Sequence, residues 1–109
     1  MKILFDQGTP APLKDLLLNH DVSTAYELGW STLKNGELLS AAESNGFEVF
    51  ITTDTNLQYQ QNLIQRKIAI VVLSTTSWPR IKPNTSTIIA AVNQSTNNGF
   101  IEVNIPFND

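Results

Sequence analysis

A run of six consecutive apolar residues, from Ile68 to Leu73, constrains the fold of this chain more than any other feature. Apolar character without polar alternation is typical of a strand that is buried on both faces, as in a parallel sheet flanked by helices. Other apolar runs alternate with segments of helical periodicity. The predicted strands are residues 2–5, 21–25, 48–53, 68–73 and 100–105, the predicted helices are residues 10–19, 35–46, 55–65 and a segment that begins at Asn84, and the longest predicted loop is residues 74–84. This alternation predicts an α/β fold, a three-layer α/β/α sandwich with a mainly parallel five-stranded sheet.

The size and composition of the chain limit what such a fold can do. Its 109 residues predict a single domain, residues 1–109. The lack of cysteine excludes disulfides, thiolate nucleophiles and iron–sulfur clusters, and the single histidine, His20, excludes a multi-histidine metal cage. A net charge of −3 argues against strong non-specific binding to nucleic acid backbones. Because no apolar run approaches the roughly 18 residues of a membrane span and no signal sequence opens the chain, we expect a cytoplasmic protein without membrane contact.

Two of the predicted strands are followed by an aspartate, Asp6 and Asp54. In open parallel sheets, ligands bind beyond the carboxyl ends of the strands, at the point where the winding direction reverses. If these two strands are neighbours at that point, both carboxylates face one crevice, and Glu37, at the start of the intervening helix, lies at the same end of the sheet. Oxygen ligands without histidine or cysteine suit Mg²⁺ or Mn²⁺. A metal ion held there would polarise a phosphodiester and lower the pKa of a bound water.

Each of these acidic residues also has a structural interpretation, which stays open at the level of sequence. Asp54 is of a type commonly found as a helix N-cap. Glu37 would stabilise the first turn of its helix through the helix dipole. Asp6 has no helix to cap directly after it, and the convergence of the three residues at one sheet edge favours a functional site.

Polar residues near the predicted edge offer contacts to a substrate. The segment 56–62 is rich in amides, where lysine or glutamate would solvate a helix equally well. This composition indicates a face, including Gln60, that hydrogen-bonds to a substrate strand or to a partner. Lys34, Arg80 and Lys82 are the cations in loops near the same rim; they are candidates for contacts with phosphates, although a solvated surface explains them equally well.

Several motifs together resemble the small PIN-like domains of bacterial genomes, which are similar to the toxin ribonucleases of toxin–antitoxin pairs. The motifs are Ile3-Leu4-Phe5-Asp6 with Pro10 and Leu13, Glu27-Leu28-Gly29-Trp30, Glu37-Leu38-Leu39 with Ala42, and Thr52-Thr53-Asp54-Thr55-Asn56-Leu57. The resemblance implies a Rossmann-like sheet and an acidic cluster that holds Mg²⁺ or Mn²⁺ for hydrolysis of RNA. By motif, the metal ligands would be Asp6, Glu37 and Asp54, with Asn56 as a further catalytic position. The partners implied are an RNA substrate, a small antitoxin protein and a second copy in a homodimer.

The chain departs from the PIN-like pattern at two positions. Related domains commonly carry an acid two residues before the glutamate and another two residues after the third-strand aspartate, where this chain has Asn35 and Asn56. Fewer carboxylates favour an alternative, a PIN-like binding module that does not cleave RNA. A second alternative is a phospho-receiver domain, since Asp6 and Asp54 have suitable spacing. It fits less well, because Gln7 stands where receivers have a second acid and no lysine follows the fifth predicted strand.

Overall fold

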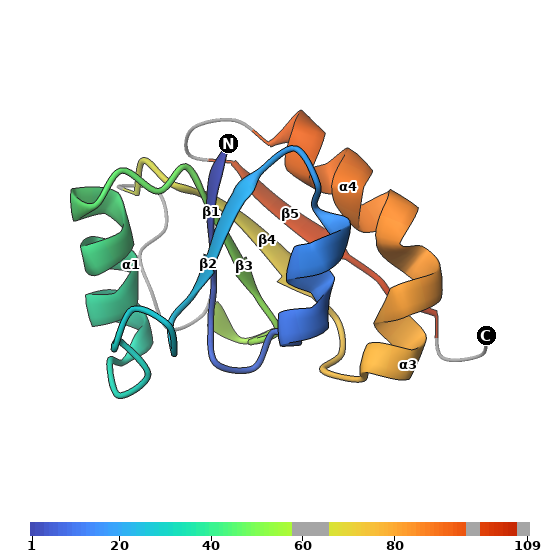
Figure 1. Ribbon diagram of the computed structural model, residues 1–109, viewed down its shortest axis with the longest axis horizontal. Helices are drawn as coiled ribbons and strands as arrows, with labels where there is room; N and C mark the ends of the chain where they lie inside the picture. The colour runs from blue at the N-terminus through green and yellow to red at the C-terminus, as the bar shows by residue number, and fades with distance from the viewer. Residues whose placement is uncertain (58–65, 96–98, 107–109) are drawn as a thin grey trace.

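The sheet consists of five parallel strands in the computed structural model, which describes residues 1–57, 66–95 and 99–106 (Figure 1). The strands are β1 (Lys2–Phe5), β2 (Asp21–Thr24), β3 (Val49–Thr52), β4 (Ala69–Leu73) and β5 (Phe100–Val103). Their order is β2-β1-β3-β4-β5, so β2 and β5 are the edge strands. This is a doubly wound order in which the winding direction reverses between β1 and β3. The predicted α/β fold with a parallel sheet is confirmed.

Helices cover both faces of the sheet and divide the core into two clusters (Figure 1). The helices are α1 (Asn35–Ser44), the 3₁₀ helix η1 (Ala11–Leu16), α3 (Trp78–Ile81), the 3₁₀ helix η3 (Lys82–Asn84) and α4 (Thr85–Gln94). Leu4 and Phe50 pack in the cluster that contains the apolar face of α1, whereas Ile3 and Phe5 pack with η1, α3 and α4. Successive side chains of a strand point to opposite faces of a sheet, so a strand covered on both faces needs apolar residues throughout. This is why the central strands β1, β3 and β4 are almost entirely apolar, whereas the edge strands β2 and β5 include polar residues.

Two segments differ from the prediction because of the prolines in them. The helix predicted for residues 10–19 is the six-residue 3₁₀ helix η1, which follows Pro10 and ends at Leu16. The loop predicted for residues 74–84 is wrong, since it contains α3 and η3, each with a proline in its first turn. A first turn does not use the missing N–H group, and the fixed φ of proline suits it, so these prolines start helices rather than exclude them.

The longest described helices, α1 and α4, have ten residues each. In the part of the chain that the structure describes, no helix has the length and apolar character needed to cross a membrane. Of the helix predicted for residues 55–65, Leu57 is helical and buried, and residues 58–65 lie outside the described ranges. Asn35, where the second predicted helix starts, is the first residue of α1, and Lys34 occupies the N-cap position.

A partly buried ion pair joins α1 to the start of β4. The Arg66 guanidinium donates to the Glu43 carboxylate at 2.9 Å, and the backbone N–H groups of Lys67 and Ile68 donate to its other oxygen at 2.6 and 3.4 Å. Burial works against ionisation of Glu43, but the hydrogen bonds and the positive charge of Arg66 outweigh it and lower the pKa of this carboxyl below its ordinary value of 4.5. The ionised form is therefore favoured in the folded state.

Glu43→Gln is expected to lower the free energy of unfolding at neutral pH by about 1 kcal/mol, because the amide removes the charge and one acceptor oxygen. A pKa lowered by folding contributes stability that is complete above the unfolded pKa and is lost as the pH falls through the folded pKa. The difference between wild type and variant should therefore shrink as the pH falls below about 4.5. Urea unfolding over this range measures it, with the exposed Glu102→Gln as the matched control; a difference independent of pH would contradict the assignment.

Candidate active site at the carboxyl edge of the sheet

Asp6 and Asp54 lie at the carboxyl ends of two neighbouring strands. β1 and β3 pair in parallel with Phe5 opposite Ile51, and the Asp6 N–H continues the ladder to the Ile51 carbonyl at 3.2 Å. Asp54 comes two residues after the end of β3. Because the winding reverses between these strands, this is the edge at which open parallel sheets bind ligands. The sequence left the adjacency of these two strands open, and the structure shows that they are neighbours. We refer to Asp6 and Asp54 as the switch-point carboxylates.

The Asp6 carboxylate is buried, with 7% of the residue exposed, and three hydrogen bonds hold it. Its Oδ1 accepts from the Thr9 N–H at 2.9 Å and from the Thr9 hydroxyl at 2.6 Å. Its Oδ2 accepts from the Thr52 hydroxyl at 2.5 Å. Three short hydrogen bonds to a charged acceptor hold the Asp6 carboxylate in one orientation. The same bonds stabilise the loop that follows β1.

The Asp54 carboxylate is half-buried, and two donors among the described residues hold it. Its Oδ1 accepts from the Asn56 N–H at 3.0 Å, a local turn that satisfies the helix-cap interpretation, while its Oδ2 accepts from the Asn35 side-chain amide at 2.7 Å. Asn35 therefore contributes to this edge from the first turn of α1. Asn56 contacts Asp54 through its backbone N–H, which makes it a positioning residue for that carboxylate.

The Thr52 hydroxyl links the Asp6 carboxylate to the backbone of Asp54. It donates to Asp6 Oδ2 and accepts the Asp54 N–H at 3.0 Å. Thr52 is fully buried at the end of β3, between an apolar strand and Asp54. The sequence predicted no role for Thr9 or for Thr52, although Thr52 belongs to one of the PIN-like motifs and is a polar residue at the end of a buried strand.

The contacts of Glu37 match its structural interpretation, a residue that stabilises the first turn of its helix. Its carboxylate is exposed and accepts from the backbone N–H of Lys34 at 3.2 Å, which closes the first turn of α1. Among residues 1–57, 66–95 and 99–106, no three aspartate, glutamate, histidine or cysteine side chains are grouped so that they could hold a metal ion. The metal set of Asp6, Glu37 and Asp54 thus stays a prediction.

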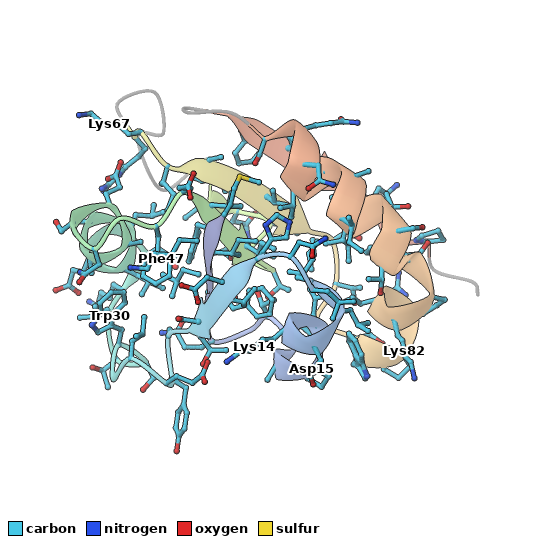
Figure 2. All side chains as sticks on the ribbon, turned by 45° about the horizontal axis from the view of Figure 1, so that its top comes forward. Lys14, Asp15, Trp30, Phe47, Lys67 and Lys82 are labelled. Carbon is cyan, nitrogen blue, oxygen red and sulfur yellow. The ribbon has the colours of Figure 1, made fainter. Side chains whose placement is uncertain are left out.

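The candidate substrate contacts are spread over several elements. Lys34 is exposed at the start of α1, and Lys82 is exposed in η3, at the end of the molecule near α3 in Figure 2. The Arg80 guanidinium donates to the carbonyls of Ile105 and Pro106 at 3.0 and 3.2 Å, so it ties α3 to the segment after β5. Gln60 lies outside the described residues.

A cleft of about 580 Å³ opens beyond the carboxyl ends of β1 and β2, and we call it the β1–β2 cleft. It is lined by residues 6–11, Lys14, Thr24, Tyr26, Glu27 and Thr76. Lys14, labelled on η1 in Figure 2, donates to both oxygens of Glu27 at 2.9 and 3.1 Å. The hydrogen bond from Lys14 and another from the Thr24 N–H lower the pKa of the Glu27 carboxyl. Asp6 is the residue that this cleft shares with the switch-point carboxylates.

Gly8 allows the loop after β1 to lie directly against the loop after β3. A Cβ atom at this position would lie 2.5 Å from the Thr53 hydroxyl oxygen and 3.9 Å from Asp6 Oδ1. A contact that short would force Thr53 or the loop to move. The absence of a side chain at Gly8 therefore helps to keep the two carboxyl-edge loops together.

No family model, curated protein or solved structure matches the chain. The likeness to PIN-like domains therefore rests on the sequence motifs around Asp6, Glu37 and Asp54.

Proposed function

We propose that the protein is a PIN-like ribonuclease that depends on Mg²⁺ or Mn²⁺ and uses Asp6 and Asp54 as its metal ligands. The observation that supports this proposal is the pair of switch-point carboxylates at the edge where parallel sheets bind ligands, with the Thr52 hydroxyl bridging the Asp6 carboxylate and the backbone N–H of Asp54. The resemblance to toxin ribonucleases extends the proposal to the toxin of a toxin–antitoxin pair in the cytoplasm, with a small antitoxin protein as partner.

The donor set at this edge fits a hard divalent cation. Among the residues that the structure describes, each oxygen of Asp54 and the Oδ2 atom of Asp6 accepts one hydrogen bond, and a carboxylate oxygen has lone pairs for more than one partner. Mg²⁺ is usually held by one or two carboxylates, keeps several waters and takes further ligands from substrate phosphates. Two carboxylates therefore suffice for a site that binds the cation most tightly together with RNA.

The residues of the chain have distinct roles in this proposal. A bound cation would supply polarisation of the scissile phosphodiester and a water of lowered pKa. Thr9 and Thr52 hold the Asp6 carboxylate in a fixed orientation. Asn35 and Asn56 hold Asp54, so that both carboxylates are positioned before substrate arrives.

One contact favours the second candidate, a PIN-like binding module that does not cleave RNA. The Asn35 amide donates to Asp54 Oδ2, where an acidic residue in related domains would repel this carboxylate. The amide satisfies Asp54 without a cation. In a binding module, this edge would be a hydrogen-bonded surface rather than a metal centre.

A cleavage assay separates the two candidates. Single-stranded RNA is incubated with the purified chain in Mn²⁺, in Mg²⁺ and in EDTA, and products are resolved on a denaturing gel. Cleavage in Mn²⁺ or Mg²⁺ that EDTA abolishes supports the ribonuclease. Lack of cleavage under all three conditions supports the binding module.

Asn35→Asp tests the same site by adding the carboxylate that related domains carry. Without metal, the variant should be less stable than wild type by about 1 kcal/mol, because a hydrogen bond to Asp54 becomes a like-charge contact. Added Mn²⁺ should raise its melting temperature more than that of wild type, since an ion that binds the folded state stabilises it by mass action. Thermal unfolding with a Mn²⁺ titration measures both effects, and the exposed Asn45→Asp is the control. Equal Mn²⁺ responses in the two variants would place Asn35 outside the metal site.

A further inference from the structure

The β1–β2 cleft is larger than hydrolysis of a phosphodiester at the switch-point carboxylates requires. Its volume of about 580 Å³ lies within the roughly 300–1,000 Å³ of small-molecule sites, whereas a phosphodiester held by two carboxylates needs no such depth. Its lining includes Asp6 but not Asp54, and it includes residues of η1 and of the turn after β2. The cleft can therefore receive a group attached to the phosphate.

Tyr26 is the residue that indicates what this group is. β1 and β2 pair with Phe5 opposite Thr24, and the Ala25 N–H continues the ladder to the Phe5 carbonyl at 2.9 Å. Tyr26 follows directly, so it stands at the same sheet edge as Asp6 and lines the same cleft. It is nevertheless 81% exposed, an unusual position for a large aromatic side chain that the core does not use. An exposed ring at the wall of a cleft provides a platform on which a planar group can stack.

The charges of the cleft favour a neutral planar group over a phosphate. Glu27 and Lys14 neutralise one another, and Asp6 adds a negative charge at the inner end. Hydrogen-bonding groups are present on the walls. The Gln7 amide donates its N–H to the Ser31 carbonyl at 2.7 Å, which leaves its carbonyl oxygen as an acceptor. The Thr24 hydroxyl accepts the Glu27 N–H at 3.1 Å, and its oxygen has a further lone pair that can accept a hydrogen bond.

From these observations we propose that the β1–β2 cleft binds an unpaired nucleobase of single-stranded RNA, stacked on Tyr26, with the adjoining phosphate at the switch-point carboxylates. This assignment rests on the proposed ribonuclease function and names its substrate class. A base within a duplex is paired and stacked, so it cannot enter the cleft without being flipped out. The cleft thus selects single-stranded over double-stranded RNA.

The test is a binding measurement on the full chain that does not depend on cleavage. Fluorescence anisotropy with a labelled short oligouridylate, in Ca²⁺ and in EDTA, compares wild type with Tyr26→Ala and Tyr26→Phe. Loss of the ring should weaken binding by about 10-fold, and the phenylalanine variant should stay within about twofold of wild type. Leu28→Ala, in the same turn but outside the cleft, is the matched control and should bind as wild type does. A blunt RNA duplex and free uridine monophosphate serve as further probes.

The outcomes separate this proposal from the ribonuclease itself. Tyr26-dependent binding of the single strand, with no effect of Tyr26→Ala on the duplex, supports the base site even if no cleavage is found. Binding of free uridine monophosphate with the same dependence on Tyr26 also supports the site and shows that a single nucleotide suffices. Equal affinities of wild type and Tyr26→Ala, or an equal loss in Tyr26→Ala and Tyr26→Phe, would overturn the stacking site even if RNA is cleaved.

Discussion

Asp54→Asn is expected to reduce Mn²⁺-dependent cleavage of RNA by more than about 100-fold, since loss of a ligand should exceed the roughly 10- to 100-fold effect of losing an outer-shell contact. The variant replaces one carboxylate oxygen by an NH₂ group, which cannot coordinate a cation. The fold should tolerate the change. The remaining oxygen can accept the Asn56 N–H, and the Asn35 amide can turn its oxygen towards the new donor.

Initial cleavage rates and urea unfolding, measured on the same preparations, test this expectation. Asp21→Asn is the matched control, because it makes the same substitution at an exposed residue. Asp21 is the first residue of β2, so it lies at the amino end of the strand, away from the carboxyl edge that carries the candidate site. Glu37→Gln should have a smaller effect than Asp54→Asn, since the Glu37 carboxylate closes the first turn of α1. A wild-type rate in Asp54→Asn would remove Asp54 from the site and point to a contaminating nuclease.

The parts of the fold that the sequence predicted are those for which local composition is sufficient. The run 68–73 predicted a strand buried on both faces, and β4 is buried at every position. Gly46 predicted the end of the second helix, and its φ of +79° is the left-handed conformation that glycine adopts after a helix. The prolines of residues 74–84 were misinterpreted because proline is compatible with both a loop and a first helical turn. Only packing against the sheet, here by Ile81, distinguishes the two.

In the candidate site, too, some residues could be identified from the local sequence, whereas others depend on which strands pair. Asp6 and Asp54 were predictable as strand-end acids, because strand ends can be identified from apolar runs. The hydrogen bond from Thr52 to Asp6 depends on the pairing of β1 with β3, which composition does not determine. The position of Tyr26 beside Asp6 depends in the same way on the register of β1 with β2. Side chains that contact across strands thus became identifiable only once the strand order was known.

Asp6→Ala is expected to lower the free energy of unfolding by about 3 kcal/mol, because hydrogen bonds to a buried charged acceptor are each worth roughly 1.5–3 kcal/mol and their loss leaves buried donors unpaired. The donors affected are the Thr9 N–H and the hydroxyls of Thr9 and Thr52. The Thr9 hydroxyl keeps a second acceptor, the Ile51 carbonyl at 3.0 Å, which reduces the cost. A loss of this size is a large fraction of the roughly 5–15 kcal/mol that stabilises a domain.

Denaturant unfolding at neutral pH without metal compares Asp6→Ala with Asp54→Ala and Asp6→Asn. Asp54→Ala should cost about 1 kcal/mol, because its carboxylate is only half-buried and water can replace the acceptor. Asp6→Asn should lie between the two, since its amide keeps an oxygen for Thr9 and offers an N–H to the Thr52 hydroxyl. Equal costs for the two alanine variants would contradict a structural role specific to Asp6. The expected order implies that Asp6 holds the loop after β1 against β3 in addition to its proposed role as a metal ligand. The stability of each Asp6 variant must therefore be measured before a loss of cleavage is attributed to the loss of a metal ligand.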